Sequence, residues 1–199
     1  MSVGESSGAM APARRTSSRV ARPSPAELAA AQGRGLPDLI QPGLRVLFCG
    51  INPSLYSAAV QHHFARPGNR FWRTLYAAGF TERVLSPSEQ GELLERGIGL
   101  TNVVAKASAS ADELTREDYR RGCASLRRKL QRHRPRVIAF LGLGAYRIVA
   151  QQPLARVGLQ PEPFAGVVAW ALPNPSGLNA HYRLEELARC YAELARTVS

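Results

Sequence analysis

The chain has 199 residues and a formal net charge of +11, with 26 basic residues against 15 acidic ones. This length suits one domain with a sizeable core, and no apolar run approaches the roughly 20 residues that span a bilayer. We therefore expect no membrane partner, and no apolar stretch behind Arg14, Arg15 and Arg19 indicates a secretory signal. The excess positive charge predicts a polyanionic partner, most simply nucleic acid.

The three cysteines are Cys49, Cys123 and Cys190, which are widely spaced and odd in number. Without a C-x-x-C pair, the pattern argues against a disulfide framework, a zinc ribbon or a cysteine-ligated iron–sulfur cluster. We expect reduced, buried thiols in a cytoplasmic protein, and neither a metal ion nor another cofactor.

The first part of the chain differs in composition from the rest. Residues 1–37 are rich in Ala, Pro, Ser and Arg and nearly lack large apolar side chains. Such a segment buries too little surface to offset its ordering entropy, so it is expected to be a disordered basic arm with at most a short helix over Pro25–Gln32. Folding is expected to begin near Asp38, which makes residues 38–199 a single domain.

Beyond the arm, apolar runs alternate with helical segments, and Gly and Pro mark the boundaries. The predicted strands are residues 45–50, 100–104, 136–141 and 167–172. The predicted helices are residues 70–78, 88–96, 117–133, 144–151 and 184–197. This alternation predicts an α/β fold with a parallel sheet covered on both faces.

Two loops, Gly50–Leu55 and Asn174–Asn179, each follow a strand-like run and hold an Asn-Pro pair. Loops that leave the carboxyl ends of parallel strands converge on one crevice, where ligands bind in such sheets. Asn52 has two interpretations. It is either ordinary turn chemistry, or its amide oxygen holds a water while nearby backbone N–H groups bind an anion.

Other side chains also have two interpretations. Phe64 either anchors its loop to the core or stacks on a flat heterocycle at the crevice. Asp112 either caps the helix that follows it or faces the crevice as a carboxylate. The arginine-rich helix 116–134 presents either a solvated face or phosphate contacts. The glycines at 142 and 144 lack the third glycine of a dinucleotide-binding turn, which favours strand-to-helix packing.

Three strings occur in order: FCGINP at 48–53, FARPGNRFW at 64–72 and NPSGL at 174–178. Together they resemble the mismatch-specific uracil/thymine-DNA glycosylases of the uracil-DNA glycosylase superfamily, most closely the bacterial G:U-specific branch. The similarity runs from about Asp38 to the C-terminus. It implies a three-layer α/β/α sandwich with a short, mostly parallel central sheet. It also implies metal-free hydrolysis of the N-glycosidic bond of a flipped uracil, by a monomer acting on double-stranded DNA that contains mismatched uracil.

The resemblance also implies roles for the residues that match its motifs. Asn52 would position the attacking water, and Phe64 would stack on the uracil ring. Backbone groups around Ile51 and Ser54 would read the polar edge of the base, and Asn174 would hold the base and its leaving-group side.

In the same resemblance, Gly177, Leu178 and Asn179 would form the wedge that enters the duplex and fills the gap left by the extruded base. A neutral asparagine orients water but hardly deprotonates it, so turnover should be modest. Flipping costs a few kcal/mol of stacking and pairing, and less at a mismatch, which would favour G:U over A:U.

Two positions depart from the family pattern. Ser54 stands where the family usually has glycine, and Ala180 stands where the bacterial pattern usually offers a wedge arginine, a role that Arg183 could take over. These departures leave room for broader substrates, with Asp112 as a supplementary carboxylate. The alternatives are therefore a broad-specificity uracil glycosylase not restricted to mismatches, and a catalytically idle DNA-binding module on the same fold.

Overall fold

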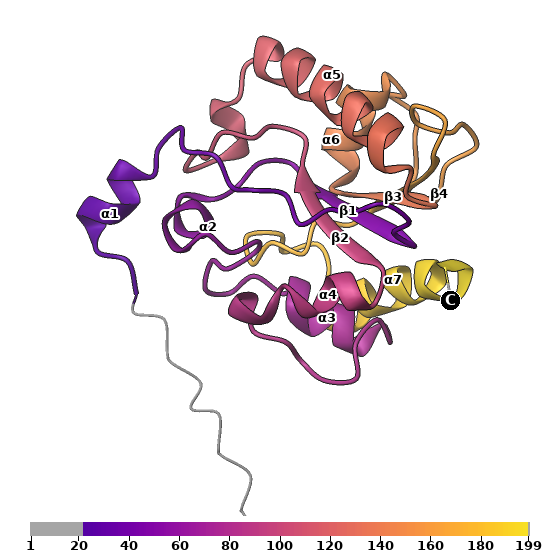
Figure 1. Cartoon of the computed structure of the whole chain (residues 1–199), viewed down its shortest axis with the longest axis horizontal. Helices are drawn as coiled ribbons and strands as arrows, with labels where there is room; N and C mark the ends of the chain where they lie inside the picture. The colour runs from indigo at the N-terminus through magenta and orange to yellow at the C-terminus, as the bar shows by residue number, and fades with distance from the viewer. Residues whose placement is uncertain (1–21, 199) are drawn as a thin grey trace, which may run out of the picture.

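A computed structural model describes residues 22–198 of the chain (Figure 1). Its centre is a five-stranded sheet in the order β2-β1-β3-β5-β4. Four strands are parallel and the short edge strand β4 is antiparallel to β5. The strands are β1 Val46–Gly50, β2 Ile98–Asn102, β3 Val137–Leu141, β4 Gly158–Leu159 and β5 Val168–Leu172. The predicted α/β fold with a mostly parallel sheet is confirmed.

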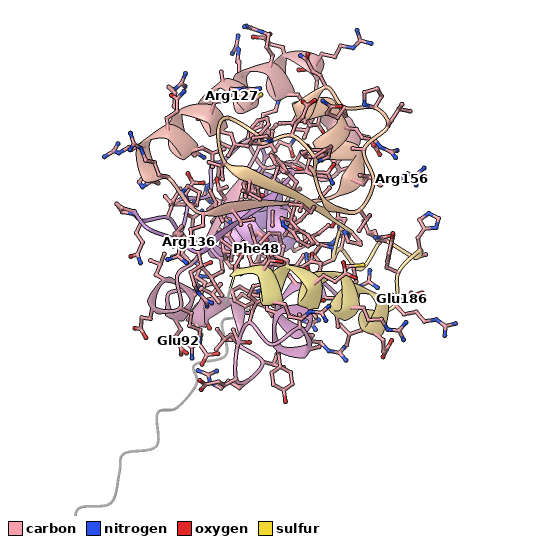
Figure 2. All side chains as sticks on the ribbon, turned by 90° about the vertical axis from the view of Figure 1, so that its right-hand side faces the viewer. Phe48, Glu92, Arg127, Arg136, Arg156 and Glu186 are labelled. Atoms are coloured by element: carbon pink, nitrogen blue, oxygen red, sulfur yellow. The ribbon has the colours of Figure 1, made fainter. Side chains whose placement is uncertain are left out.

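Helices cover both faces of the sheet, as Figures 1 and 2 show. Helices α5 and α6 lie on one face, and α3, α4 and α7 lie on the other. The helices are α1 Pro25–Ala30, α2 Leu55–Val60, α3 Phe71–Ala77, α4 Glu92–Glu95, α5 Arg116–His133, α6 Leu143–Ala150 and α7 Leu184–Val198, with short 3₁₀ turns at 87–89 and 111–113. Within the described chain, no helix has both the length and the apolar character to cross a membrane.

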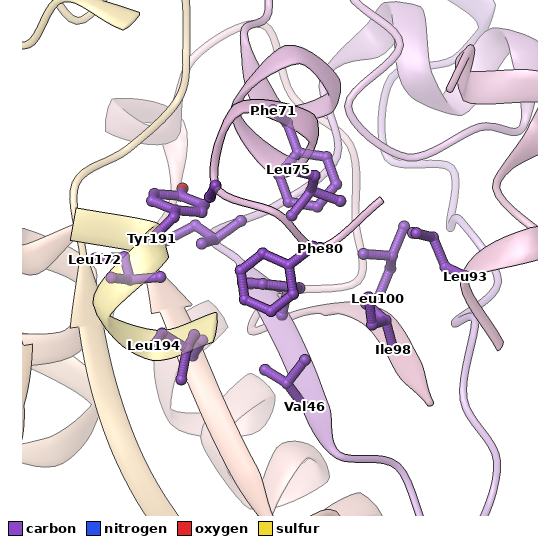
Figure 3. Close-up of a cluster of buried hydrophobic side chains, with 14 of the residues drawn as sticks. Val46, Phe71, Leu75, Phe80, Leu93, Ile98, Leu100, Leu172, Tyr191 and Leu194 are labelled. Carbon is purple, nitrogen blue, oxygen red and sulfur yellow. The ribbon is translucent and has the colours of Figure 1, made fainter. Parts of the chain in front are cut away.

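The two faces are built by alternation along each buried strand. Val46 and Phe48 of β1 point into the layer with α3 and α7, and Figure 3 shows Val46 in this layer. Phe48 packs edge-on against Phe71 there, with ring centroids 5.6 Å apart. Leu47 and Cys49 point into the opposite layer, under α5 and α6. All five residues of β1 are buried, as expected for a parallel strand with helices on both sides.

The long helix α5 starts at a well-formed cap that also holds the preceding loop. The side chains of Thr115 and Asp118 cap each other's backbone N–H groups, which satisfies two free donors of the first turn. Lys106 approaches the same carboxylate at 2.7 Å. Hydrogen bonds from Lys106 and Thr115 lower the pKa of Asp118 to about 2. The loop between β2 and α5 is therefore fixed at both ends.

Several boundaries differ from the sequence prediction. β2 begins two residues earlier than predicted, and the predicted helix 88–96 is a 3₁₀ turn followed by the single turn of α4. Helix α2 and strand β4 have no counterpart among the predicted elements, because segments of six and two residues are too short to show a hydrophobic period.

The short helix expected over Pro25–Gln32 is present as α1, but the prediction that the rest of residues 22–37 is disordered is wrong, and residues 1–21 lie outside the described part. Helix α1 begins with a capping box between Ser24 and Glu27. Ala31 is fully buried against Ala58 and Ala107. The backbone N–H of Gly33 donates to the Ala107 carbonyl at 2.9 Å. This close alanine packing gives no large apolar signal in the sequence, so composition alone misses it.

Truncation should show that residues 22–37 stabilise the domain. A chain that starts at residue 38 should unfold at a lower temperature than one that starts at residue 22. The burial of Leu36 alone is worth roughly 2 kcal/mol. Thermal unfolding followed by circular dichroism measures the difference, and equal midpoints would contradict the contribution of this segment.

Candidate active site

A pocket of about 400 Å³ lies at the carboxyl ends of β1, β2, β3 and β5. The chain leaves β1 toward β2 on one side, whereas β3 lies on the other side of β1, so the loops diverge here and leave a crevice. The lining combines backbone, amide, hydroxyl and aromatic groups, most of them from the segments that follow β1, β2 and β5. Among the lining residues are Gly50, Ile51, Asn52, Pro53, Ser54, His63, Phe64, Arg66, Asn102, Ser108, Asp112, Asn174, Leu178 and Asn179.

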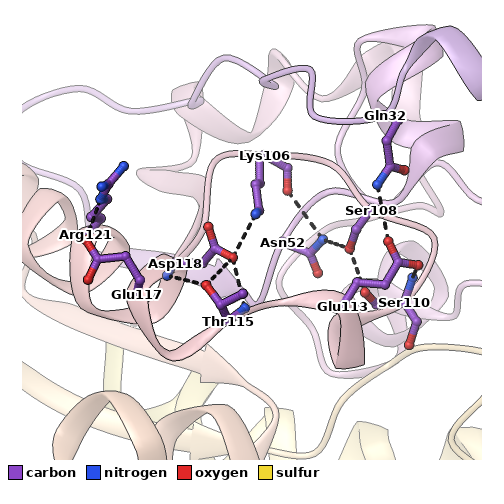
Figure 4. Close-up of polar contacts among 10 residues, drawn as sticks. All are labelled: Gln32, Asn52, Lys106, Ser108, Ser110, Glu113, Thr115, Glu117, Asp118 and Arg121. Carbon is purple, nitrogen blue, oxygen red and sulfur yellow. Dashed lines mark hydrogen bonds and ion pairs between the residues drawn. The ribbon is translucent and has the colours of Figure 1, made fainter.

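The amide of Asn52 is held in one orientation. Its nitrogen donates to the hydroxyl of Ser108 at 2.8 Å and to the Lys106 carbonyl at 3.4 Å (Figure 4). It also donates to the Pro53 carbonyl at 3.2 Å. A flipped amide would set its oxygen against those two carbonyls, so the hydrogen bonds fix the assignment. Within residues 22–198 the Asn52 oxygen accepts no hydrogen bond, which leaves it as the acceptor available to the pocket.

Ser108 is a site residue that the sequence analysis missed. Its hydroxyl donates to the Ser110 carbonyl at 2.6 Å and therefore accepts from Asn52. Its backbone pairs with Ser54 across the two loops. A serine in a small-residue loop carries no motif, so only the tertiary contact shows its role of orienting Asn52.

The floor of the pocket is made by Gly50, Asn102 and Phe64. A Cβ on Gly50 would overlap the Asn102 Oδ1 and lie 3.3 Å from the Phe64 ring. One face of Phe64 stacks on Phe71 with ring centroids 4.1 Å apart, which leaves the other face for a flat ligand. Phe64 has a φ of 52°, an unusual conformation for a bulky residue that directs its ring into the site.

Asn102 is a second residue that the sequence analysis missed. It ends β2, is 6% exposed, and its amide has no hydrogen-bond partner within residues 22–198. The amide is not among the fully buried polar atoms that lack a partner, so it keeps access to the pocket, where a ligand can replace solvent as its hydrogen-bond partner. The rule that located Asn52, a polar side chain at the carboxyl end of a buried strand, could have found Asn102 as well.

His63 lies beside Phe64 in the pocket wall and is 1% exposed. Its Nε2 is 3.0 Å from the Pro37 carbonyl, so in the neutral ring Nε2 carries the proton and Nδ1 is an acceptor. Burial lowers the pKa of His63. Pro37, the last residue of the segment 22–37, thus connects this segment to the pocket wall.

Ser54 and Asp112 occupy different positions at the site. The Ser54 hydroxyl accepts from the backbone N–H of Ser57 at 3.1 Å and so caps α2, which explains a serine at this position. Asp112 is exposed at the pocket mouth and accepts a hydrogen bond from Ser110. Its interpretation as the cap of the next helix is wrong, because Thr115 caps α5.

The second Asn-Pro loop folds back on itself with Leu178 at its tip. The Asn174 oxygen accepts from the backbone N–H of Ser176 at 2.9 Å, and its amide nitrogen has no hydrogen-bond partner among the described residues. Asn179 donates to the Asn174 carbonyl at 2.9 Å and so stabilises the loop. Leu178 is 75% exposed at the pocket rim. Gly177 does not line the pocket; a Cβ there would lie 2.5 Å from the Gly68 carbonyl oxygen.

Other features stand outside this pocket. Gly142, with a φ of 136°, is the N-cap residue of α6, and its backbone N–H donates to the Leu172 carbonyl at 2.9 Å. It therefore serves strand-to-helix packing, as the sequence analysis favoured. All three cysteines are free thiols. In the part of the chain that the structure describes, no group of three or more His, Cys, Asp or Glu side chains could hold a metal ion.

The fold and the site define the class as an open α/β domain with an amide-lined pocket at the switch point of its sheet. The model of the uracil DNA glycosylase superfamily matches residues 37–195, and the chain belongs to this superfamily. A candidate uracil DNA glycosylase from Methanosarcina acetivorans, solved by solution NMR, has a similar fold with a TM-score of 0.52 and 22% identity. The match covers 82% of this chain and 98% of that one. Membership implies a DNA glycosylase, a hydrolase that acts on uracil in DNA.

The floor of the pocket can be tested by adding a single methyl group. Gly50→Ala should reduce base release by about 100-fold, because the new Cβ displaces Asn102 and Phe64 from their positions. Single-turnover release from uracil-containing DNA measures the loss. Gly144→Ala on α6 is the matched control, since a Cβ there meets nothing within 4 Å. Full activity in Gly50→Ala would exclude this surface as the floor.

Burial of His63 predicts a pH effect on stability. Burial depresses the His63 pKa in the folded state, so above the unfolded pKa of about 6.5 the ring is neutral in both states and His63 does not lower the unfolding free energy. As pH falls below about 6.5, the unfolded state takes up the proton more readily, and the unfolding free energy declines. His63→Gln should flatten the decline of the unfolding free energy between about pH 7 and 5. The exposed His181 provides a control, His181→Gln, that should retain the wild-type slope. Urea denaturation across this range measures both slopes.

Proposed function

We propose that the chain is a monofunctional DNA glycosylase that flips uracil out of double-stranded DNA and hydrolyses its N-glycosidic bond, with preference for mismatched uracil. It would act as a monomer and without a cofactor. The observation that carries the proposal is the Asn52 amide, whose nitrogen is engaged by Ser108 and two carbonyls while its oxygen remains for a water. Superfamily membership supports the reaction class.

The pocket supports recognition of uracil by stacking and by its polar edge. The free face of Phe64 suits the flat ring, and base stacking on an aromatic side chain contributes about 1–3 kcal/mol. Uracil presents one N–H donor between two carbonyl acceptors, which a side-chain amide such as that of Asn102 complements. Asn174 and the backbone near Ile51 and Ser54 are placed for the remaining edge.

In the proposed reaction the bond between the sugar C1′ and the base N1 breaks through an oxocarbenium-like state. The water held by Asn52 gives its oxygen to C1′, and its two protons end on the new hydroxyl and on the departing base. An amide oxygen orients the water but does not take its proton at neutral pH. In the lining, Asp112 is the carboxylate that could accept that proton transiently.

The proposed wedge is the loop tip at Leu178, whose exposed side chain would enter the gap that the flipped base leaves. Gly177 and Asn179 would shape this tip, one by close backbone packing and the other by its hydrogen bond to Asn174. Ala180 and the exposed Arg183 are absent from the pocket lining. Contacts to the opposite strand would therefore come from groups outside the pocket lining or at its rim, among them Leu178 and the exposed Arg183.

The experiment that tests the function is base release from matched duplexes bearing U opposite G, U opposite A or T opposite G, and from single-stranded U. We expect the fastest release from U opposite G, and Asn52→Ala should lower that rate by about 100-fold or more while duplex binding is retained. Release from every uracil context would support the broader specificity for which Ser54 and Ala180 leave room. Binding without release from any substrate would support an idle DNA-binding module instead.

The wedge has a separate test. Leu178→Ala should weaken binding to abasic duplex DNA by about 10-fold, or roughly 1.4 kcal/mol, while cleavage of single-stranded uracil changes little. Fluorescence anisotropy with an abasic duplex measures the affinity. An equal loss on duplex and single-stranded substrates would remove Leu178 from the wedge role.

A further inference from the structure

Arg70, at the start of α3, contacts a loop more than 100 residues away in the sequence. Its guanidinium donates to the carbonyls of Ser176 at 2.7 Å and of Asn179 at 2.8 Å, and also to the carbonyls of Pro175 and Tyr182. Its own backbone N–H donates to the Pro175 carbonyl at 2.9 Å. A single side chain thus bonds four carbonyls of the loop 174–182.

These contacts have a physical reason. The loop 174–182 lies between β5 and α7 and lacks regular structure, so its carbonyls need partners from elsewhere. The planar guanidinium of arginine presents five N–H donors in a fixed fan, which suits several carbonyls at once. Arg70 is half-buried and pairs with no carboxylate within residues 22–198, so its hydrogen bonding is directed to this loop.

A second contact joins the same two segments. Gly177 packs so closely on Gly68 that an added Cβ would lie 2.5 Å from its carbonyl oxygen. Gly68 belongs to the loop 64–69, which begins with Phe64 and ends with Asn69, whose side chain accepts from the Phe71 N–H at 2.9 Å. Arg70 directly follows this loop. The segments that carry Phe64 and Leu178 are therefore fixed to each other.

We propose that Arg70 is a positioning residue that holds the Leu178 loop in register with Phe64, so that insertion into the duplex and capture of the extruded base occur at one fixed separation. This inference rests on the proposed function for the roles of Leu178 and Phe64. Arg70 itself does not line the pocket and contacts neither a base nor the reacting atoms. It acts through the carbonyls of the loop.

A double-mutant cycle tests the proposal. Arg70→Met should slow uracil release from duplex DNA by about 30-fold, consistent with the loss of several charge-assisted hydrogen bonds. In a Leu178→Ala background, the same substitution should cost less than about 3-fold, because the group that Arg70 positions is already gone. An equal fold-loss in both backgrounds would show that Arg70 acts on the pocket generally and would overturn the proposal.

Arg73→Met is the matched control, because Arg73 is exposed on α3 and its removal changes the charge equally. It should leave the duplex rate within about 2-fold of wild type. Arg70→Lys should restore little of the duplex rate, since one ammonium group cannot donate to as many carbonyls as a guanidinium. Arg70→Ala leaves a space at this position, and added guanidinium ion should partly restore its duplex rate. Failure of rescue together with a lowered unfolding midpoint would indicate a purely structural role.

Hydrogen exchange separates this proposal from the proposed function. In Arg70→Met, peptides covering residues 174–182 should exchange faster while peptides of β1 keep the wild-type rate, and Arg73→Met should change neither. This readout needs no catalysis. An inactive wild type with faster loop exchange in Arg70→Met would refute the proposed function but keep the positioning role. Unchanged loop exchange would overturn the role of Arg70 whatever the activity.

Discussion

The parallel pairing of β1 with β2 on one side and β3 on the other is the constraint on which the rest of the structure depends. It places the carboxyl ends of these strands at one edge, so that Gly50, Asn52 and Asn102 meet there although they come from two separate segments. Because β1 is buried on both faces, its register cannot slip without moving Phe48 and Cys49 into the wrong layers. The buried sheet therefore holds the strand ends that carry the site residues in fixed positions.

The loops around the pocket are held in place by polar contacts rather than by apolar burial. Ser108 orients Asn52, the capping pair of Thr115 and Asp118 fixes the loop that supplies Ser108, and Arg70 satisfies the carbonyls of the second Asn-Pro loop. Buried amides and carbonyls are costly when unpaired, so each such network admits few alternatives. Within residues 22–198, the Asn52 oxygen, the Asn102 amide and the Asn174 amide nitrogen have no hydrogen-bond partner, and all three residues line the pocket.

Local patterns predicted most of the elements but not all of the site. The two Asn-Pro loops do meet at one pocket, because strand ends can be predicted from apolar runs. The predicted residues that line it are Ile51, Asn52, Ser54, Phe64, Asp112, Asn174, Leu178 and Asn179. Ser108 and His63 were missed because their importance comes from the residues they contact, whereas Asn102, at the end of β2, could have been found by the strand-end rule. The segment 22–37 was misjudged for a related reason: Ala31 packs on two alanines, and such close contact leaves no hydropathy signal.

The sequence by itself determined the α/β class, the two Asn-Pro loops after buried strands and the motifs that point to the uracil DNA glycosylase superfamily. These are properties of neighbouring residues, and hydrophobic period and turn chemistry express them directly. Only the tertiary structure decided which way the Asn52 amide faces, how Phe64 is supported by Phe71 and which carbonyls Arg70 binds. Those contacts join residues far apart in the chain, and their geometry exists only once the sheet has brought them together.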